Sequence, residues 1–218
     1  MDNNSQMIVC VGREYGSGGH EIAKRLAKRL GIKLYDHNIL DEIALEKGVD
    51  PETLRKYDEQ PHKLFLSRSA KGHHSSAEVN IAYMQFDYLK RRADEGESFL
   101  VVGRCAEGIF QNHPGLISIF VLGNREEKCR RIMELYHLTE QEALEKMRRH
   151  DNYRKRYHNN FCEDAWGDSR TYDICINSSL KGLDVATDVL EAYIRARAKG
   201  REGQNGNVCE SSDERRQK

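Results

Sequence analysis

Residues 8–26 constrain the fold of this chain most, because they combine a short apolar run, a glycine-rich turn and an amphipathic segment. The apolar run at 8–11 favours a buried strand, and Gly16, Gly18 and Gly19 follow it closely. Glycines in this position let backbone N–H groups converge on an anion, and the start of a helix adds unpaired donors and the positive end of a dipole. The segment therefore predicts a strand, a phosphate-binding loop and a helix.

The same loop lacks two groups that loops of the G-x-x-x-x-G-K-[ST] type carry. Gly19 and His20 stand where that pattern has its lysine and its serine or threonine. The ammonium that usually contacts phosphate and the hydroxyl that usually binds magnesium are therefore missing. Phosphoryl transfer depends chiefly on positioning and on positive charge around the transferred group, so other cations of the chain would have to supply that charge.

Strand-like runs alternate with helical patterns along the chain. The strand-like runs cover 7–11, 99–102, 117–122 and 173–176. Helical patterns cover about 20–30, 38–47, 78–95, 125–136 and 139–158, and Pro51 marks a further helix start. Apolar runs without alternation are typical of strands buried on both faces. The order predicts an α/β fold with three layers, a central parallel sheet flanked by helices, and ligands at the carboxyl ends of the strands.

The charge composition is balanced, with 35 basic and 35 acidic residues, so no overall field favours nucleic acid or an acidic membrane. The six cysteines show no C-x-x-C spacing and are expected to be free thiols. No apolar stretch approaches membrane-spanning length, and no export leader precedes the first strand. We therefore expect a cytoplasmic protein that binds neither nucleic acid nor membrane, with its oligomeric state left open.

Several short motifs occur in a fixed order. They are Gly12–Gly19, Leu34–Asp36, 101–106 with its Gly103-Arg104 pair, Trp166–Asp168 and 172–179. In order and spacing they resemble the cytidylate kinase-like proteins of the P-loop nucleoside-monophosphate kinase superfamily, over roughly residues 7–195. The resemblance implies a P-loop NTPase fold, ATP and Mg²⁺ as cofactors, and a nucleotide substrate. It implies phosphoryl transfer from ATP to a nucleoside monophosphate, most simply CMP or dCMP.

The resemblance also divides the chain. It implies one kinase-like domain over 1–200, with an acceptor-binding region at about 37–95 and a mobile lid at about 137–170. The irregular segment 59–77 would be part of a mobile acceptor lid. Residues 201–218 contain almost no apolar side chains, which predicts a disordered polar tail.

Candidate site residues follow from the same resemblance. The ATP phosphates would be held by Arg13, Gly16, Ser17, Gly18, Gly19 and His20. Arg104 would bind the acceptor phosphate, and Asp36 would contact the acceptor nucleotide. The D-x-x-R pair Asp151 and Arg154 would reach the transferring group, and Arg131 would add positive charge.

Simpler roles remain open for several of these residues. Arg13 could pair with Glu14, Asp36 could cap a helix, and His20 could be an exposed first-turn residue. The arginines of 139–158 could form a solvated face balanced by nearby carboxylates.

Two positions depart from the family pattern. Glu42 stands where cytidylate kinases have an arginine for the monophosphate, and Val102 stands where they have an acidic residue. The metal ligands are therefore unassigned, with Ser17, Asp36 and Glu14 as candidates. Two alternatives to a CMP kinase stay open: a degenerate P-loop protein that binds nucleotide for regulation, and a kinase for a different small-molecule acceptor.

Overall fold

A computed structural model describes residues 6–58 and 77–205, with a five-stranded sheet at its centre. The strands are β1 (Ile8–Arg13), β2 (Lys33–Tyr35), β3 (Phe99–Val102), β4 (Leu116–Leu122) and β5 (Ile174–Asn177). Every pairing is parallel, in the order β2-β3-β1-β4-β5. The predicted parallel sheet is confirmed.

The described helices are α1 (Gly19–Leu30), α2 (Ile39–Lys47), α3 (Pro51–Asp58), α4 (Ala77–Asp94), α5 (Ala106–Ile109), α6 (Arg125–Tyr136), α7 (Glu140–Phe161) and α8 (Gly182–Asn205). The boundary predicted at residue 200 lies inside α8, which continues to Asn205. The rest of the predicted tail lies outside the described residues. The same holds for nearly all of the segment 59–77, including His62, His73 and His74.

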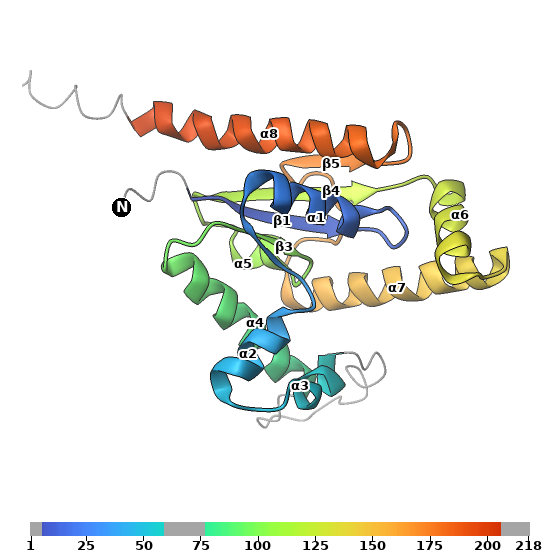
Figure 1. Cartoon of the computed structure of the whole chain (residues 1–218), viewed down its shortest axis with the longest axis horizontal. Helices are drawn as coiled ribbons and strands as arrows, with labels where there is room; N and C mark the ends of the chain where they lie inside the picture. The colour runs from blue at the N-terminus through green and yellow to red at the C-terminus, as the bar shows by residue number, and fades with distance from the viewer. Residues whose placement is uncertain (1–5, 59–76, 206–218) are drawn as a thin grey trace, which may run out of the picture.

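Helices cover both faces of the sheet, as Figure 1 shows. Because successive strand residues point to opposite faces, Val9 and Val11 pack with side chains of α1 and α8, while Ile8 and Cys10 pack with α2, α4 and α5. All four strand residues are at most 1% exposed. Two apolar cores thus hold one sheet between two helical layers, which confirms the predicted three-layer architecture.

The helix α7 places charged side chains against the loops of the sheet. It begins with a capping box, in which the Thr139 side chain accepts from the Glu142 N–H and Glu142 accepts from the Thr139 N–H. In Figure 1, α7 runs back beneath the sheet from α6, on the same side as α2, α3 and α4.

Within the described residues, no helix is both long and apolar enough to cross a membrane.

Candidate active site

The loop between β1 and α1 is built for close approach of an anion to its backbone. Gly16 and Gly18 have φ of 84° and 75°, in the region that favours glycine. A Cβ on Gly18 would lie 2.5 Å from Leu183 Cδ2, so no larger residue fits without displacement. Ser17 Oγ donates to the Glu14 carbonyl oxygen over 2.8 Å, and Ser178 Oγ donates to the Ser17 carbonyl oxygen over 2.6 Å. The polar side chains inside the loop therefore hold its shape.

A buried lysine that the sequence analysis did not single out contacts this loop. Lys128 of α6 is 8% exposed, and its Nζ lies 2.8 Å from Glu14 Oε2. The same carboxylate oxygen accepts from the Gly123 N–H over 3.0 Å. Glu14 is thus paired with Lys128 rather than with Arg13.

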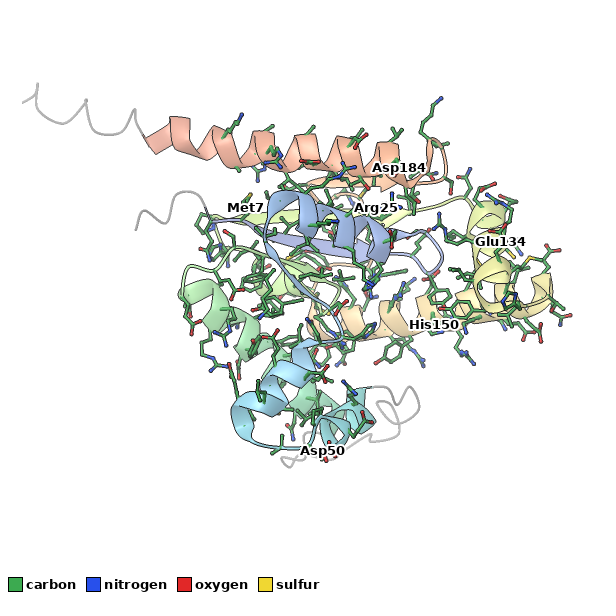
Figure 2. The ribbon with its side chains drawn as sticks, viewed as in Figure 1. Met7, Arg25, Asp50, Glu134, His150 and Asp184 are labelled. Carbon is green, nitrogen blue, oxygen red and sulfur yellow. The ribbon has the colours of Figure 1, made fainter. Side chains whose placement is uncertain are left out.

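The helix α7 is hydrogen-bonded to the backbone of the loop. Asp151 Oδ1 accepts from the Tyr15 N–H over 2.7 Å, and Arg154 Nη1 donates to the Arg13 carbonyl oxygen over 3.1 Å. The ring of Tyr15 stacks on His150 with centroids 4.2 Å apart. His150 is labelled on α7 in Figure 2. The predicted D-x-x-R pair therefore lies against the glycine loop. Asp151 contacts the backbone of Tyr15, and Arg154 contacts the backbone of Arg13.

Burial changes the ionisation of these groups. Burial raises the pKa of Asp151, and the Tyr15 N–H and nearby cations oppose that rise only in part. Burial lowers the pKa of Arg154 and brings that of His150 down to about 4. His150 is therefore a neutral stacking partner at pH 7.

Asp151→Asn tests the role of the loop contact. The amide keeps an oxygen for the Tyr15 N–H and removes a carboxylate whose ionised form burial disfavours, so stability at neutral pH should be retained or slightly increased. Because the folded-state pKa is raised, the wild type gains stability relative to the variant as the pH falls through that pKa. Any advantage of Asp151→Asn should therefore disappear in acid.

Asp151→Ala provides the comparison, because it leaves the Tyr15 N–H without its acceptor. We expect it to cost about 1–2 kcal/mol of stability. Thermal unfolding of both variants from neutral pH into acid checks these expectations. Equal losses in the two variants would contradict a hydrogen-bonding role for Asp151.

Arg13 does not point into the glycine loop; its side chain reaches the end of β3. A Cβ built on Gly103 would lie 2.3 Å from Arg13 Nη1. The Arg13 Nε atom is buried without a hydrogen-bond partner. Burial, followed by the positive charges of Arg154 and Arg104, lowers the pKa of Arg13. Three arginines therefore converge beside the carboxyl ends of β1 and β3.

These arginines line a cavity of about 460 Å³. Its cationic side chains are Arg13, Arg104, Arg149 and Arg154, and its aromatic side chains include Tyr153, Tyr157 and Trp166. Its carboxylates are Asp36 and Glu107. Glu107 already accepts from His158 Nε2 over 2.9 Å and from the Tyr172 hydroxyl over 3.1 Å. The cavity thus offers more positive charge than its own carboxylates can balance.

The turn after β3 sets the direction of Arg104. Gly103, Arg104 and Cys105 all have positive φ, at 74°, 61° and 53°. Successive left-handed residues are uncommon outside glycine and mark a backbone that its surroundings hold in place. This turn carries Arg104 into the cavity, where the sequence predicted an anion-binding guanidinium.

The remaining predicted residues are spread around the loop. His20 Nε2 lies 3.5 Å from Asp36 Oδ2, and burial lowers the pKa of His20. Asp36 Oδ1 also accepts from the Asn38 N–H, so it caps the turn before α2 while lining the cavity. Arg131 lies beside Gly18, where its Cζ would be 3.4 Å from a Cβ on that glycine.

The candidate metal ligands are already engaged by protein groups. Ser17 and Glu14 bind within the loop as described, and Asp36 contacts His20 and Asn38. Across residues 6–58 and 77–205, no three His, Cys, Asp or Glu side chains form a group suited to a metal ion.

Glu42, which stands where cytidylate kinases have an arginine, lies with its carboxylate 2.6 Å from Lys33 Nζ and is hydrogen-bonded to the Tyr88 hydroxyl.

Comparisons with known proteins identify the family and agree with the fold. Residues 8–180 match the model of the cytidylate kinase-like family. A crystal structure of an uncharacterized protein from Eubacterium ventriosum ATCC 27560 is 40% identical, with a TM-score of 0.70 over 88% of this chain and 99% of that chain. The search of curated proteins gave no match.

More distant structures share the fold alone. A gluconokinase from Sinorhizobium meliloti 1021 is 16% identical, with a TM-score of 0.53 over 92% of this chain and 97% of its own. A shikimate kinase from Bacteroides thetaiotaomicron is 10% identical, with a TM-score of 0.51 over 87% of this chain and 98% of its own. With its glycine loop, parallel sheet and family match over residues 8–180, the chain belongs to the cytidylate kinase-like family.

Proposed function

We propose that this protein transfers a phosphoryl group from ATP to a small anionic acceptor, with a nucleoside monophosphate, CMP or dCMP, as the first candidate. The observation that carries the proposal is the convergence of Arg13, Arg104 and Arg154 beside the phosphate loop. Burial of the Arg13 guanidinium and its repulsion by Arg154 and Arg104 make this arrangement unfavourable when no anion is bound. A bound phosphate would compensate both effects through charge-assisted hydrogen bonds.

The donor nucleotide would place its phosphates over the loop 16–20. Backbone N–H groups at the start of α1 would bind the phosphate oxygens, with Gly16, Gly18 and Gly19 allowing close approach and Ser17 holding the loop. Arg131 lies beside Gly18 and would supply part of the charge that the loop lysine supplies elsewhere. His20 stands at the first turn, where its ring would donate to phosphate.

The acceptor would occupy the arginine-lined cavity. Arg104 and Arg13 would bind its anionic group, Asp36 would contact its polar part, and the ring side chains would pack against a base. A cavity of about 460 Å³ lies within the range of small-molecule sites. Arg154, which contacts the loop backbone and lines the cavity, would lie between donor and acceptor, and Asp151 would hold the loop against α7.

Mg²⁺ would neutralise charge on the ATP phosphates, held chiefly by those phosphates and water. The two carboxylates of the cavity, Asp36 and Glu107, form their ion pairs with His20 and His158 in the described part of the chain. The site fits a metal carried in by the nucleotide better than a resident metal, because the loop hydroxyl of Ser17 is already used within the loop.

A kinase for a different small acceptor is the second candidate. Glu42 contacts Lys33 and Tyr88 and does not line the cavity. Position 42 therefore offers no guanidinium that could bind the phosphate of CMP. The similar folds named above belong to a shikimate kinase and a gluconokinase, and a carboxylate-bearing polyol would also satisfy the arginines. A degenerate nucleotide-binding protein remains the outcome if no acceptor supports turnover.

ADP release from the purified protein with Mg-ATP tests these alternatives. The panel contains CMP, dCMP, UMP, AMP, GMP, shikimate and gluconate. Turnover with CMP or dCMP supports the first candidate, and turnover only with a polyol acid supports the second. Nucleotide binding without turnover on any of them would contradict a CMP or dCMP kinase and favour a degenerate nucleotide-binding protein or an acceptor outside the panel.

Arg104→Ala should affect the KM for the acceptor much more than the KM for ATP. We expect the acceptor KM to rise about tenfold or more, because a charge-assisted contact to the anionic group is lost, while the ATP KM changes by less than about twofold. Arg130→Ala is the control, because the exposed Arg130 pairs with Glu127 and Glu134 of its own helix and, among the described residues, with no group of the cavity. Steady-state kinetics with each substrate varied in turn makes the comparison, and an equal rise in both KM values would contradict the assignment.

A further inference from the structure

Four ionisable side chains meet where the end of α7 contacts the turn after β3. Cys162 follows α7 as its C-terminal cap residue, and His158 lies one turn earlier on the same helix. Cys105 precedes α5, and Glu107 lies within it. The kinase proposal gives this cluster no role, although Cys105, Glu107 and His158 line the same cavity as the arginines.

The contacts within the cluster place Cys162 against Cys105. The two thiols lie close enough for each to affect the pKa of the other. Cys162 Sγ lies 4.0 Å from the Cys105 carbonyl oxygen, and Cys105 Sγ lies 4.0 Å from the Tyr157 carbonyl oxygen. A Cβ on Gly108 would lie 2.5 Å from Cys162 Sγ, so the sulfur fits into a space that only glycine leaves open. Cys162 Sγ is therefore packed between Gly108 and the backbone of Cys105.

A buried base and acid flank Cys162. His158 Nε2 lies 2.9 Å from Glu107 Oε1, and these two side chains are 6% and 10% exposed. His158 Nδ1 lies 3.3 Å from Asn159 Oδ1, and the Cys162 N–H donates to the His158 carbonyl oxygen over 2.8 Å. The groups that face the Cys162 sulfur are thus Cys105, His158 and Glu107, from the β3 turn, α7 and α5.

These contacts favour a thiolate at Cys162. The hydrogen bond from Cys105, followed by that from His158, lowers the pKa of Cys162 to about 6 against the opposing effect of burial. Burial acts to lower the pKa of His158, but its bonds to Cys162 and Glu107 outweigh burial and raise that pKa to about 10. The pKa of Cys105 is raised, chiefly by its hydrogen bond to Cys162. Cys162 is therefore the more readily ionised of the two thiols.

We propose that Cys162 and Cys105 are a redox-active pair, in which a peroxide oxidises Cys162 and Cys105 resolves the product to a disulfide. The Cys162 thiolate attacks a peroxide oxygen, so that an S–O bond forms, the O–O bond breaks and hydroxide leaves. The Cys105 sulfur then attacks the Cys162 sulfur, so that the S–S bond forms and the S–O bond breaks. The departing hydroxide takes the Cys105 proton as water. Two thiols lose two electrons, and hydrogen peroxide becomes two molecules of water.

The disulfide would join α7 to the turn that carries Arg104. Cys105 is the next residue after Arg104, and Arg154 lies two turns before Cys162 on α7. A covalent bond at this point restrains the approach of α7 to the cavity. Where the protein acts as a kinase, the oxidised form should lose turnover and regain it on reduction. Disulfide formation itself is measured without any activity, so a failure of the kinase proposal leaves this inference testable.

Mass spectrometry of the full chain after graded hydrogen peroxide tests the pair. A Cys209→Ser background removes the cysteine outside the described residues. We expect one intramolecular Cys105–Cys162 linked peptide that dithiothreitol releases, and its absence in Cys162→Ser and in Cys105→Ser. Cys129→Ser, which removes another buried thiol, should leave the linkage intact. Sulfinic acid on Cys162 with Cys105 still free in the wild type would overturn the proposal.

The pH profile of alkylation tests the thiolate directly. With iodoacetamide, the Cys162 rate should rise with a midpoint near pH 6 in the wild type. His158→Gln removes the charged partner and should move that midpoint toward higher pH, with an alkylation rate severalfold lower at pH 7. A wild-type midpoint near that of an ordinary thiol would overturn the assignment of Cys162 as the nucleophile.

Discussion

Replacing Arg13 by methionine is expected to lower turnover by about 100-fold or more while leaving the protein at least as stable as the wild type. The guanidinium has a buried Nε without a partner among the described residues and lies near two other arginines, so in the absence of ligand Glu107 and Asp151 compensate its charge only in part. An apolar side chain of similar length removes that cost. The loss of turnover follows because a positive charge aimed at a reacting phosphate contributes on the order of 100-fold or more.

Arg25→Met is the matched control for this experiment. Arg25 lies on α1 and pairs with Glu21 and with Asp184 of α8, as Figure 2 shows for the two labelled residues. Exposed pairs of this kind contribute little, so the control should keep full turnover and nearly all of its stability. Thermal unfolding without ligand and initial rates with saturating ATP make the comparison. If Arg13→Met is strongly destabilised and keeps its turnover, Arg13 is a structural residue and the proposed anion site is wrong.

Gly18→Ala should weaken ATP binding by about 100-fold. The new Cβ would lie 2.5 Å from Leu183 Cδ2, at a residue whose φ of 75° already disfavours any side chain. The Leu183 side chain must shift and the backbone at residue 18 must leave its left-handed conformation, so the N–H groups at the start of α1 lose their common direction. Loss of two charge-assisted hydrogen bonds to phosphate costs about 3 kcal/mol, which corresponds to that factor.

Gly31→Ala separates backbone strain from the effect on the site. Gly31 caps the other end of α1, has a φ of 67°, and has no atom within 4 Å of an added Cβ. It should lose about 1 kcal/mol of stability and bind ATP normally. Isothermal titration of ATP into both variants gives the affinities. Equal binding by the two would show that the loop does not hold the donor phosphates through its backbone.

The local features of the fold could be predicted because each depends on neighbouring residues. The strand and loop before α1 follow from an apolar run and three glycines, and α6 begins and ends at the predicted residues 125 and 136. The four-residue α5 is too short to show helical spacing. The helix α8 was not identified, although Ala186, Leu190 and Ile194 are spaced for one buried face against the sheet. The residues after Gly200 were assigned to a tail on composition, which missed the last turn of α8.

The site is less predictable because its contacts join distant parts of the chain. The sequence indicated that Arg13, Arg104 and Arg154 would matter, but it could not show that Arg13 crosses from the glycine loop to Gly103. Lys128 has no distinguishing neighbours in sequence, and only the fold brings it to Glu14, 114 positions away. The pairing of Cys105 with Cys162 likewise spans 57 positions and carries no spacing signal.

The mass of the reaction product tests the central claim most directly, which is that ATP donates a phosphoryl group to an acceptor held by the Arg13, Arg104 and Arg154 cluster. Wild-type protein, Arg13→Met and Arg25→Met are incubated with Mg-ATP and the acceptor panel, and the products are identified by mass. The account predicts one acceptor that gains a phosphoryl group with the wild type and with Arg25→Met, and about 100-fold less of that product with Arg13→Met. Phosphorylated product at the same rate from all three proteins would contradict it, as would ATP binding without any phosphorylated acceptor.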